Sequence, residues 1–408
     1  MMKRQHALCV KMVSVFVLVA LLCLQAPSFA AQDKDIGTVR DIYNGALFPD
    51  KAVRTYSNWG KLFPTRVIKA GGKVQPLPKS DKQLSTLTFT SAGKKYDLVD
   101  YVALNQVVAM IVLKDGKVAF EHYDRGVTEK THWMSMSIAK PFVSTLVGAA
   151  IKDGAIKSID DMVVDYLPQL KGSAYDGVSV RNILMMASGV KWDETYTNPQ
   201  SDRRKYLEIQ IASNKQGALF DLMKSLPKAA PPGTVLNYST GETALIGEVL
   251  QAATKKNLSQ YCSEKLWVPL GMESDATWVL DSPNGHEVGG TGMNIVPRDF
   301  ARFGQFLLNG AIVGGKALVP DGYLAEATSP KEMGGKTVYH GYQWWPVDPA
   351  EGAVHAGAFH MKAIQGQFLY VNPKEKVVIV VLSARSKPTG RDVVKDLDCF
   401  AGVIEALR

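Results

Sequence analysis

The sequence lacks the residue clusters by which several classes of protein are recognised. Its seven histidines are scattered and only four cysteines occur in 408 residues, so no Cys/His group has the spacing of a metal site. No glycine-rich phosphate loop stands between a predicted strand and a predicted helix. No basic cluster is interleaved with aromatic residues, which argues against nucleic acid as a partner. We therefore expect no metal, no other cofactor and no nucleic acid.

Two of the four cysteines fall within the first thirty residues, which have the pattern of a secretory signal peptide. Lys3 and Arg4 give a basic start, an apolar run follows over 12–24, and small residues end the segment at Ala30. The run is too short to span a bilayer, so we expect cleavage near Ala30 and no stable membrane anchor. The expected location is periplasmic or secreted. Removing the three basic residues of this segment lowers the formal charge from +8 to +5.

The mature chain keeps Cys262 and Cys399. In an exported protein they could pair as a disulfide or remain separate buried thiols, and the sequence leaves both possibilities open. A hydrophobic share of 46% is enough for a large core. The length suggests one elaborated domain or two intimately packed ones.

The pattern Ser-x-x-Lys occurs four times, starting at Ser91, Ser137, Ser188 and Ser225. Only Ser137 opens a sustained helical pattern, which Gly154 ends, whereas the other three contain glycine or proline. Residues three apart share a helix face, so Lys140 would lie beside the Ser137 hydroxyl. A neutral lysine can take the serine proton and create a nucleophile. For the tetrapeptide alone, an N-cap serine with a solvated lysine is the competing interpretation.

Strands are predicted near both ends of the body. Residues 107–124 have the pattern of a hairpin with an Asp-Gly turn. Residues 367–371 and 377–382 read as two further strands, and a closing helix is expected from about Asp392. Early and late strands with helices between them favour an α/β (α+β) fold, an antiparallel sheet flanked by helices with a mainly helical insertion.

Two segments are expected in the mature chain, and the second contains a subdomain. Residues 31–100 are polar and turn-rich, and we interpret them as an N-terminal extension packed on the main body. Residues 101–408 would form that body. Within it, a helical subdomain is expected at about 155–330.

Tyr238 is a candidate for a third chemical group. It follows a Pro-Pro-Gly turn and precedes a helical pattern, so a loop would present its side chain. A tyrosine can relay a proton to a leaving group if nearby lysine charge lowers its pKa. A tyrosine packed at a loop corner is the competing interpretation.

Together these stretches resemble the serine-hydrolase family of class C β-lactamases, DD-peptidases and related esterases. Five ordered matches carry the resemblance, at residues 137–140, 180–189, 232–241, 266–272 and 298–304. Within the family the chain is most similar to 6-aminohexanoate-dimer hydrolases and their esterase relatives, through residues 62–66, 342–345 and 364–367. The resemblance implies a β-lactamase/transpeptidase-like fold.

The resemblance also implies roles for individual residues. Ser137 would form an acyl-enzyme, Lys140 would act as general base, and Tyr238 would pass the proton to the leaving group. Tyr196 and Asn294 fall where the subfamily has residues that contact substrate. A surface loop aromatic is the competing interpretation of Tyr196.

The third motif of β-lactamases, Lys-Thr-Gly, is absent, and two stretches could replace it. His355–Gly357 resembles the esterase variant. Met361–Ile364 lies at a better distance from the glycine and glutamine that follow, and we prefer it. The main-chain N–H of Ile364 would then join that of Ser137 in the oxyanion hole. Lys362 could supply a charge, although it is one place out of register.

These observations predict a serine hydrolase that cleaves carboxylic esters or linear amides of small molecules. Thr240 stands where the family usually has asparagine, which puts in doubt the amide contact made in β-lactamases. The alternatives are a β-lactamase or DD-peptidase, or a protein of this fold that binds ligand without catalysis. The natural substrate and the oligomeric state are open at this stage.

The cysteines lie outside every motif, which generates a first prediction. Replacing Cys262 and Cys399 together with serine should leave the turnover number within a few-fold of wild type, because neither thiol takes part in the chemistry. Steady-state hydrolysis by the folded double variant measures this. A loss of about 10³-fold, the size expected for a catalytic group, would contradict it.

Overall fold

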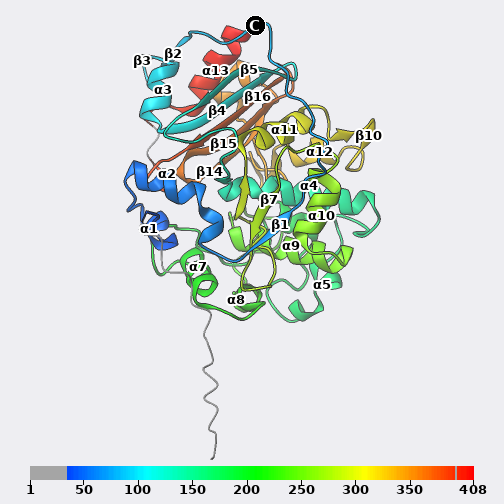
Figure 1. Cartoon of the computed structure of the whole chain (residues 1–408). Coiled ribbons are helices and arrows are strands. Elements are labelled where there is room, and N and C mark those ends of the chain that lie inside the picture. Colours follow the sequence, from blue (N-terminus) through cyan, green and yellow to red (C-terminus); the bar gives the residue numbers. More distant parts are fainter. Residues whose placement is uncertain (1–34, 391–392) are drawn as a thin grey trace, which may run out of the picture. The chain divides into compact units, whose positions relative to one another are not determined.

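Strands from early and late in the chain pair into one six-stranded antiparallel sheet (Figure 1). Its order is β13 (Trp345–Pro346), β14 (Phe359–Ala363), β15 (Gln367–Asn372), β16 (Val377–Ser383), β4 (Val107–Lys114) and β5 (Lys117–Tyr123). Every neighbouring pair is antiparallel. The predicted antiparallel sheet, the hairpin at 107–124 and the two late strands are therefore confirmed.

The computed structural model describes residues 35–390 and 393–408. The expected signal peptide lies outside the described residues, and so does Asp392, where the closing helix was predicted to begin. The helix itself, α13, runs over Asp396–Leu407. Within the described residues, no helix is both long and apolar enough to cross a bilayer.

The two faces of the six-stranded sheet are buried by different helices. In β16, Val377, Ile379 and Val381 belong to one core with α13 and α3 (Leu98–Leu104). The residues that alternate with them belong to a second core with α11 (Pro297–Leu308). Because successive side chains of a strand point to opposite faces, a strand buried on both sides must be apolar throughout, which explains the unbroken hydrophobic run of residues 377–382.

A second antiparallel sheet, which was not predicted, lies below the first in the view of Figure 1. Its order is β1 (Thr65–Ile68), β7 (Ala276–Val279), β8 (Met293–Ile295) and β6 (Trp133–Met134). The sequence suggested one sheet with a helical insertion, but β7 and β8 lie inside the range expected to be helical. Strands of two to four residues carry too little alternation to be recognised in sequence. Three two-stranded ribbons complete the strands: β2 (Thr88–Ser91) with β3 (Lys94–Asp97), β9 (Ile312–Val313) with β10 (Lys316–Ala317), and β11 (Lys331–Met333) with β12 (Lys336–Val338).

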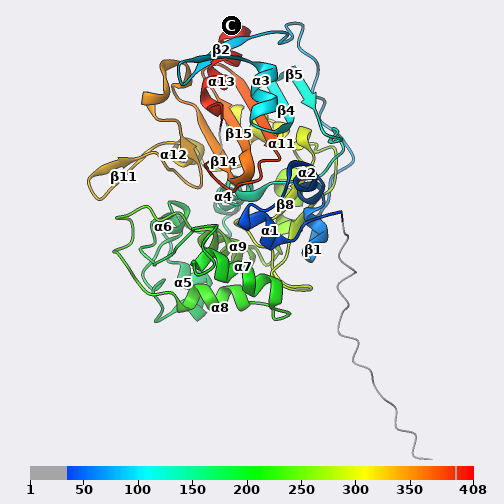
Figure 2. The ribbon, with the colours of Figure 1, turned by 90° about the vertical axis from the view of Figure 1, so that its left-hand side faces the viewer.

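Most remaining helices gather on one side of the six-stranded sheet, with α4 (Ala139–Lys152) between them and the sheet (Figure 2). The α-helices are α1 (Val39–Asn44), α2 (Pro49–Ser57), α5 (Val163–Tyr166), α6 (Val180–Leu184), α7 (Asp202–Ala212), α8 (Ala218–Ser225), α9 (Thr240–Thr254), α10 (Leu258–Cys262) and α12 (Tyr323–Ala327). Shorter or irregular turns are η1 (Trp59–Lys61), η2 (Met136–Ile138), η3 (Pro168–Leu170), η4 (Ser263–Trp267), η5 (Pro349–Glu351), η6 (Ala353–His355) and η7 (Ile364–Gly366).

The segment before residue 100 contributes directly to the packing of the body. Its strand β1 pairs with β7. On α1, the Tyr43 hydroxyl contacts the buried guanidinium of Arg203 on α7, and Arg40 pairs with Glu208 of the same helix at 2.5 Å. The hydroxyl of Tyr56 on α2 donates to a main-chain carbonyl just after β16 at 3.0 Å. These contacts join α7 to the end of the large sheet.

Cys262 on α10 and Cys399 on α13 are both buried and both free. Of the two possibilities that the sequence left open, the structure shows separate buried thiols. Burial raises the pKa of each thiol above its ordinary value. Raising a thiol pKa keeps the group protonated and chemically inert.

One buried carboxyl makes the stability of this fold depend on pH. Glu242 on α9 contacts the Ser188 hydroxyl. Burial raises the pKa of Glu242 from 4.5 to about 8, and the hydrogen bond from Ser188 opposes the shift. The folded protein therefore holds a proton that the unfolded chain releases above its lower pKa. The free energy of unfolding should fall as pH rises from the unfolded pKa through the folded one.

Replacing Glu242 with glutamine should remove this fall in the free energy of unfolding, because the glutamine amide is neutral at every pH. The midpoint of thermal unfolding of E242Q, measured relative to wild type, should rise steadily between about pH 5 and pH 9. Glu208→Gln is the matched control, since it removes an exposed carboxylate. Parallel curves for wild type and E242Q would show that Glu242 is ionised in the folded state.

Candidate active site

The residue before Ser137 has an unusual backbone conformation. Met136 has φ 44°, in the left-handed region, which costs a non-glycine residue about 1–3 kcal/mol and is most often retained at functional sites. The turn η2 is held against β8, because the Ser135 amide donates to the Met293 carbonyl at 2.8 Å. The Met293 amide in return donates to the Ser135 hydroxyl at 3.1 Å. The predicted helix begins at Ala139, so η2 presents Ser137 immediately before it.

Lys140, in the first turn of α4, lies beside Ser137 as the three-residue spacing requires. Its Nζ atom is 2.8 Å from Ser137 Oγ. Two further neighbours surround the amine: the Gly290 carbonyl at 2.6 Å and Thr240 Oγ1 at 3.2 Å. A Cβ atom on Gly290 would stand 2.3 Å from the Thr240 carbonyl oxygen, so only glycine allows this approach.

Burial makes Lys140 a base near neutral pH. Loss of hydration lowers the pKa of its amine from 10.5 to about 7, the carboxylate of Glu194 opposes this, and the guanidinium of Arg203 adds to it. A large fraction of the amine is therefore neutral at pH 7. A neutral amine at hydrogen-bond distance from the Ser137 hydroxyl can accept its proton.

Tyr238 completes the group from the loop before α9. Its ring centroid is 5.0 Å from Lys140 Nζ and its ring stacks on Trp345 at 6.0 Å. Burial raises the pKa of Tyr238 well above its ordinary value, the Glu194 carboxylate raises it further, and a hydrogen bond with Ser137 opposes both. The lowered pKa on which the predicted relay depended is not found, because loss of hydration dominates. Tyr238 is therefore a neutral phenol that can donate a proton.

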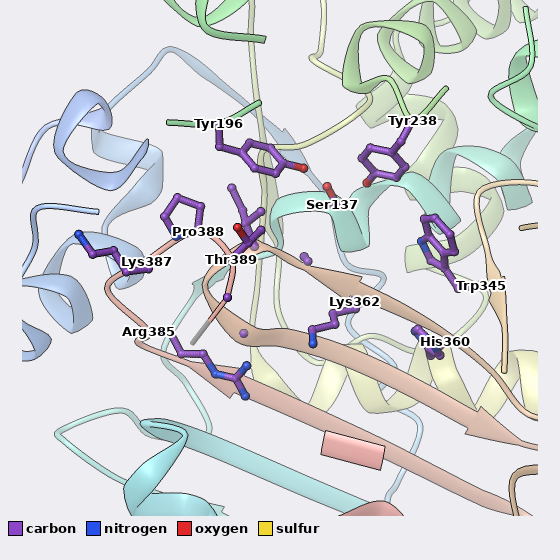
Figure 3. A pocket seen from close by; sticks show the side chains of 14 residues that line it. Ser137, Tyr196, Tyr238, Trp345, His360, Lys362, Arg385, Lys387, Pro388 and Thr389 are labelled. Atoms are coloured by element: carbon purple, nitrogen blue, oxygen red, sulfur yellow. The ribbon is translucent and has the colours of Figure 1, made fainter. Parts of the chain in front are cut away.

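A cavity of about 410 Å³ opens in front of Ser137 (Figure 3). The hydroxyl groups of Tyr196 and Tyr238 both point toward Ser137 in this view. Tyr196 comes from the loop before α7, and its ring packs against that of Tyr43 at 6.2 Å. The other residues that line the cavity are Trp345, His360, Lys362, Ala363, Ile364, Gly366, Arg385, Lys387, Pro388, Thr389 and Gly390.

Of the two stretches that could replace the third motif, the structure places Met361–Ile364 at the cavity. Ile364 lies in η7, between β14 and β15, and lines the same cavity as Ser137. His355 lies in η6, where its Nδ1 atom is 2.8 Å from the Tyr370 hydroxyl. It does not line the cavity.

The wall opposite the two tyrosines carries several basic groups. Lys362 on β14 lines the cavity and pairs with Asp396 at 3.5 Å. Arg385 also lines it and pairs with the same carboxylate at 2.8 Å. Lys387 donates to the Gly45 carbonyl at 3.0 Å, which holds the lining loop against α1. The sequence patterns indicated Lys362 but not Arg385 or Lys387, which follow β16 in a loop without a motif.

Asn294 is not among the residues that line the cavity, and its contact with substrate stays a prediction. It lies on β8, where its amide donates to the Thr277 hydroxyl at 2.8 Å, and its side chain is 3% exposed. A Cβ atom on Gly60 would stand 3.4 Å from the Asn294 side-chain nitrogen, so Gly60 packs close to this amide. Asn294 therefore stabilises the smaller sheet.

Sequence reasoning also missed Glu194, whose carboxylate accepts a hydrogen bond from the Thr240 hydroxyl, which in turn contacts Lys140. A glutamate in an irregular loop has no periodicity or spacing that would single it out. Within residues 35–390 and 393–408, no group of three or more His, Cys, Asp or Glu side chains could hold a metal ion.

Comparisons with known proteins agree with this geometry. The family model described as Beta-lactamase matches residues 104–398. The 6-aminohexanoate-dimer hydrolase of Paenarthrobacter ureafaciens is 27% identical over 349 residues, which cover 82% of this chain and 86% of that protein. A β-lactamase of Yersinia enterocolitica is 22% identical, with 74% of this chain and 87% of that protein covered.

Solved structures show the same fold. A structure named "Putative 6-aminohexanoate-dimer hydrolase from Bacillus anthracis" has a TM-score of 0.76 at 23% identity, covering 87% of this chain and 94% of that one. A family VIII carboxylesterase has a TM-score of 0.56 at 17% identity, covering 73% of this chain and 90% of that one. The predicted fold class is confirmed.

The pKa of Lys140 generates a prediction that needs no substrate. A fluorophosphonate probe should add its mass to the peptide that holds Ser137 and to no other serine peptide. Because only neutral Lys140 can accept the proton, the rate of labelling should rise with pH through about 7 and level off above it. Mass spectrometry of timed samples measures both. Labelling at Ser91, Ser188 or Ser225 would overturn the assignment.

Proposed function

Because the chain belongs to the Beta-lactamase family, we propose that it is a serine hydrolase that cleaves carboxylic esters or linear amides through an acyl-enzyme on Ser137. The observation that carries the proposal is the buried amine of Lys140, 2.8 Å from Ser137 Oγ. The names of the 6-aminohexanoate-dimer hydrolase and the family VIII carboxylesterase support this choice of substrates. The proposed location is the periplasm or the medium, because residues 1–30 have the composition of a signal peptide.

The first half of the reaction acylates Ser137. Neutral Lys140 takes the hydroxyl proton as Oγ attacks the carbonyl carbon. The main-chain N–H groups of Ser137 and Ile364 hold the oxygen that becomes negative. Tyr238 gives its proton to the departing alcohol or amine, and the protonated Lys140 replaces it. The phenol is neutral in this site, so it carries the proton that the leaving group needs.

The second half releases the acyl group by the same path in reverse. A water molecule takes the place of the leaving group and loses a proton to the base as it attacks the ester carbonyl. The tetrahedral intermediate collapses, Ser137 Oγ recovers its proton, and a carboxylic acid leaves. Tyr196, whose hydroxyl faces Ser137 (Figure 3), is proposed to contact the substrate near the scissile bond.

A β-lactamase or DD-peptidase is the second candidate, favoured by the family and by the Yersinia enterocolitica relative. The absence of Lys-Thr-Gly argues against it, because the basic third motif usually holds the carboxylate of a β-lactam. A protein that only binds ligand is the third candidate. A neutral base beside a hydroxyl has no evident use in a binding protein, which argues against it.

A panel of p-nitrophenyl butyrate, linear amides and nitrocefin tests the proposal. Purified enzyme should hydrolyse the ester or an amide, and nitrocefin much more slowly. Ser137→Ala should abolish acyl-enzyme formation. Nitrocefin turnover comparable to the best ester would favour the β-lactamase, and no turnover of any substrate would favour the binding protein.

Single and double variants test whether the three groups act in series. Lys140→Ala and Tyr238→Phe should each lower turnover by about 10²–10⁴-fold, the range for a positioned acid or base. The double variant should be scarcely worse than either single one, because groups that act as a unit are not additive. Multiplicative losses in the double variant would contradict a shared proton path.

A further inference from the structure

Glu194 forms a buried cluster of hydrogen bonds behind the catalytic pair. One carboxylate oxygen accepts from the Thr240 hydroxyl at 2.5 Å, and the other accepts from the Thr240 amide at 2.9 Å. The second oxygen also accepts from the Trp192 indole at 2.5 Å. Arg203 is 3.8 Å away, and the side chain of Glu194 is only 12% exposed. The proposed reaction leaves this cluster without a role.

The direction of these hydrogen bonds follows from the chemistry of the groups. An ionised carboxylate can only accept, so the Thr240 hydroxyl must donate its single hydrogen to Glu194. The oxygen of Thr240 then has only lone pairs to offer to Lys140, whose Nζ is 3.2 Å away. Thr240 therefore accepts one N–H of Lys140.

The same reasoning fixes the other positions around the amine. The Gly290 carbonyl, at 2.6 Å, can only accept, so it takes a second N–H of Lys140. A neutral amine has two N–H bonds and one lone pair. With both N–H bonds used, the lone pair is left for the third neighbour, the Ser137 hydroxyl at 2.8 Å.

We infer that Glu194 is a positioning residue that acts through Thr240 to aim the lone pair of Lys140 at Ser137. The inference rests on the proposed function, and adds residues to which the sequence motifs gave no role. This role accounts for Thr240, which stands where the family usually has asparagine. A hydroxyl can serve as an acceptor for Lys140 only if another group takes its hydrogen, and Glu194 is that group.

The charge of Glu194 has a second effect at the same site. The titratable groups that face Lys140 are Tyr238 before α9, Glu194 before α7, Arg203 on α7 and His340 before β13. Tyr238 and His340 are both neutral near pH 7, because burial raises the pKa of the phenol and lowers that of the imidazole to about 3. Glu194 and Arg203 therefore act on the Lys140 pKa with opposite signs. Removing the carboxylate alone should lower that pKa.

Variants of Thr240 test the route by which Glu194 acts. Thr240→Val keeps the shape but removes the acceptor, and should lower kcat for p-nitrophenyl butyrate by about 10²-fold, the size expected from a misaligned reacting group. KM should stay within a few-fold, because Thr240 is not among the residues that line the cavity. Thr240→Ser restores the hydroxyl and should recover most of the activity. A Thr240→Val enzyme with wild-type kcat would overturn the inference.

Glu194→Gln tests the charge. It should lower kcat and move the acid limb of kcat/KM to lower pH, whereas a merely structural residue would reduce the folded fraction without moving the limb. Glu208→Gln, which removes an exposed carboxylate on α7, should leave the profile unchanged. If folded E194Q keeps the acid limb of kcat/KM at the wild-type pH, the effect of the Glu194 charge on the Lys140 pKa is refuted.

The rate of fluorophosphonate labelling at Ser137 allows wild type and the Thr240 variants to be compared without a substrate. If wild type is labelled but hydrolyses no member of the panel, the proposed function fails, and the order of labelling rates among the Thr240 variants still tests the inference. If wild type hydrolyses esters and Thr240→Val is labelled as fast as wild type, the inference alone fails.

Discussion

The burial of one amine is the constraint on which the site depends. Lys140 is completely removed from water, and a charged ammonium in such a place is unfavourable unless its surroundings compensate. The surroundings compensate only in part, with one carbonyl, two hydroxyls and a distant carboxylate. The amine consequently stays near the balance point between its two protonation states. A base in that condition can take a proton and return it within one catalytic cycle.

The neighbours of Lys140 are kept uncharged by the same burial. Tyr238 holds its proton, and the imidazole of His360 on the cavity wall stays neutral because burial lowers its pKa to about 3. Arg203 pairs with Glu194 behind the amine, whereas Lys362 and Arg385 pair with Asp396 at the cavity wall. The groups in hydrogen-bond contact with the Lys140 amine are thus neutral, and the charges that act on its pKa, Glu194 and Arg203, form an ion pair. Fixed charges at this distance can tune a pKa without competing for the proton.

Much of this architecture could be predicted from the sequence, and the failures have identifiable causes. β16 was recognised from its unbroken apolar run and the helix after Ser137 from its helical periodicity. β6 and β8 are too short to show any period. The contact of Asn294 with substrate stays a prediction, because a match in sequence does not say which face of a strand a side chain occupies. Glu194 was missed because its importance arises from contacts with Thr240 and Lys140 that only the folded loop creates.

The pairing of β16 with β4 has a consequence for the order in which the protein can fold. These two neighbours in the large sheet are separated by most of the chain. Contacts between such distant segments form slowly, because a long loop must close before the pairing contributes any stability. During synthesis, the ribosome releases Ser137 and Lys140 long before β14, β15 and β16 exist. The nascent chain therefore carries its nucleophile and base without the sheet that forms the wall of the cleft, and catalytic competence must arrive as one of the last events of folding.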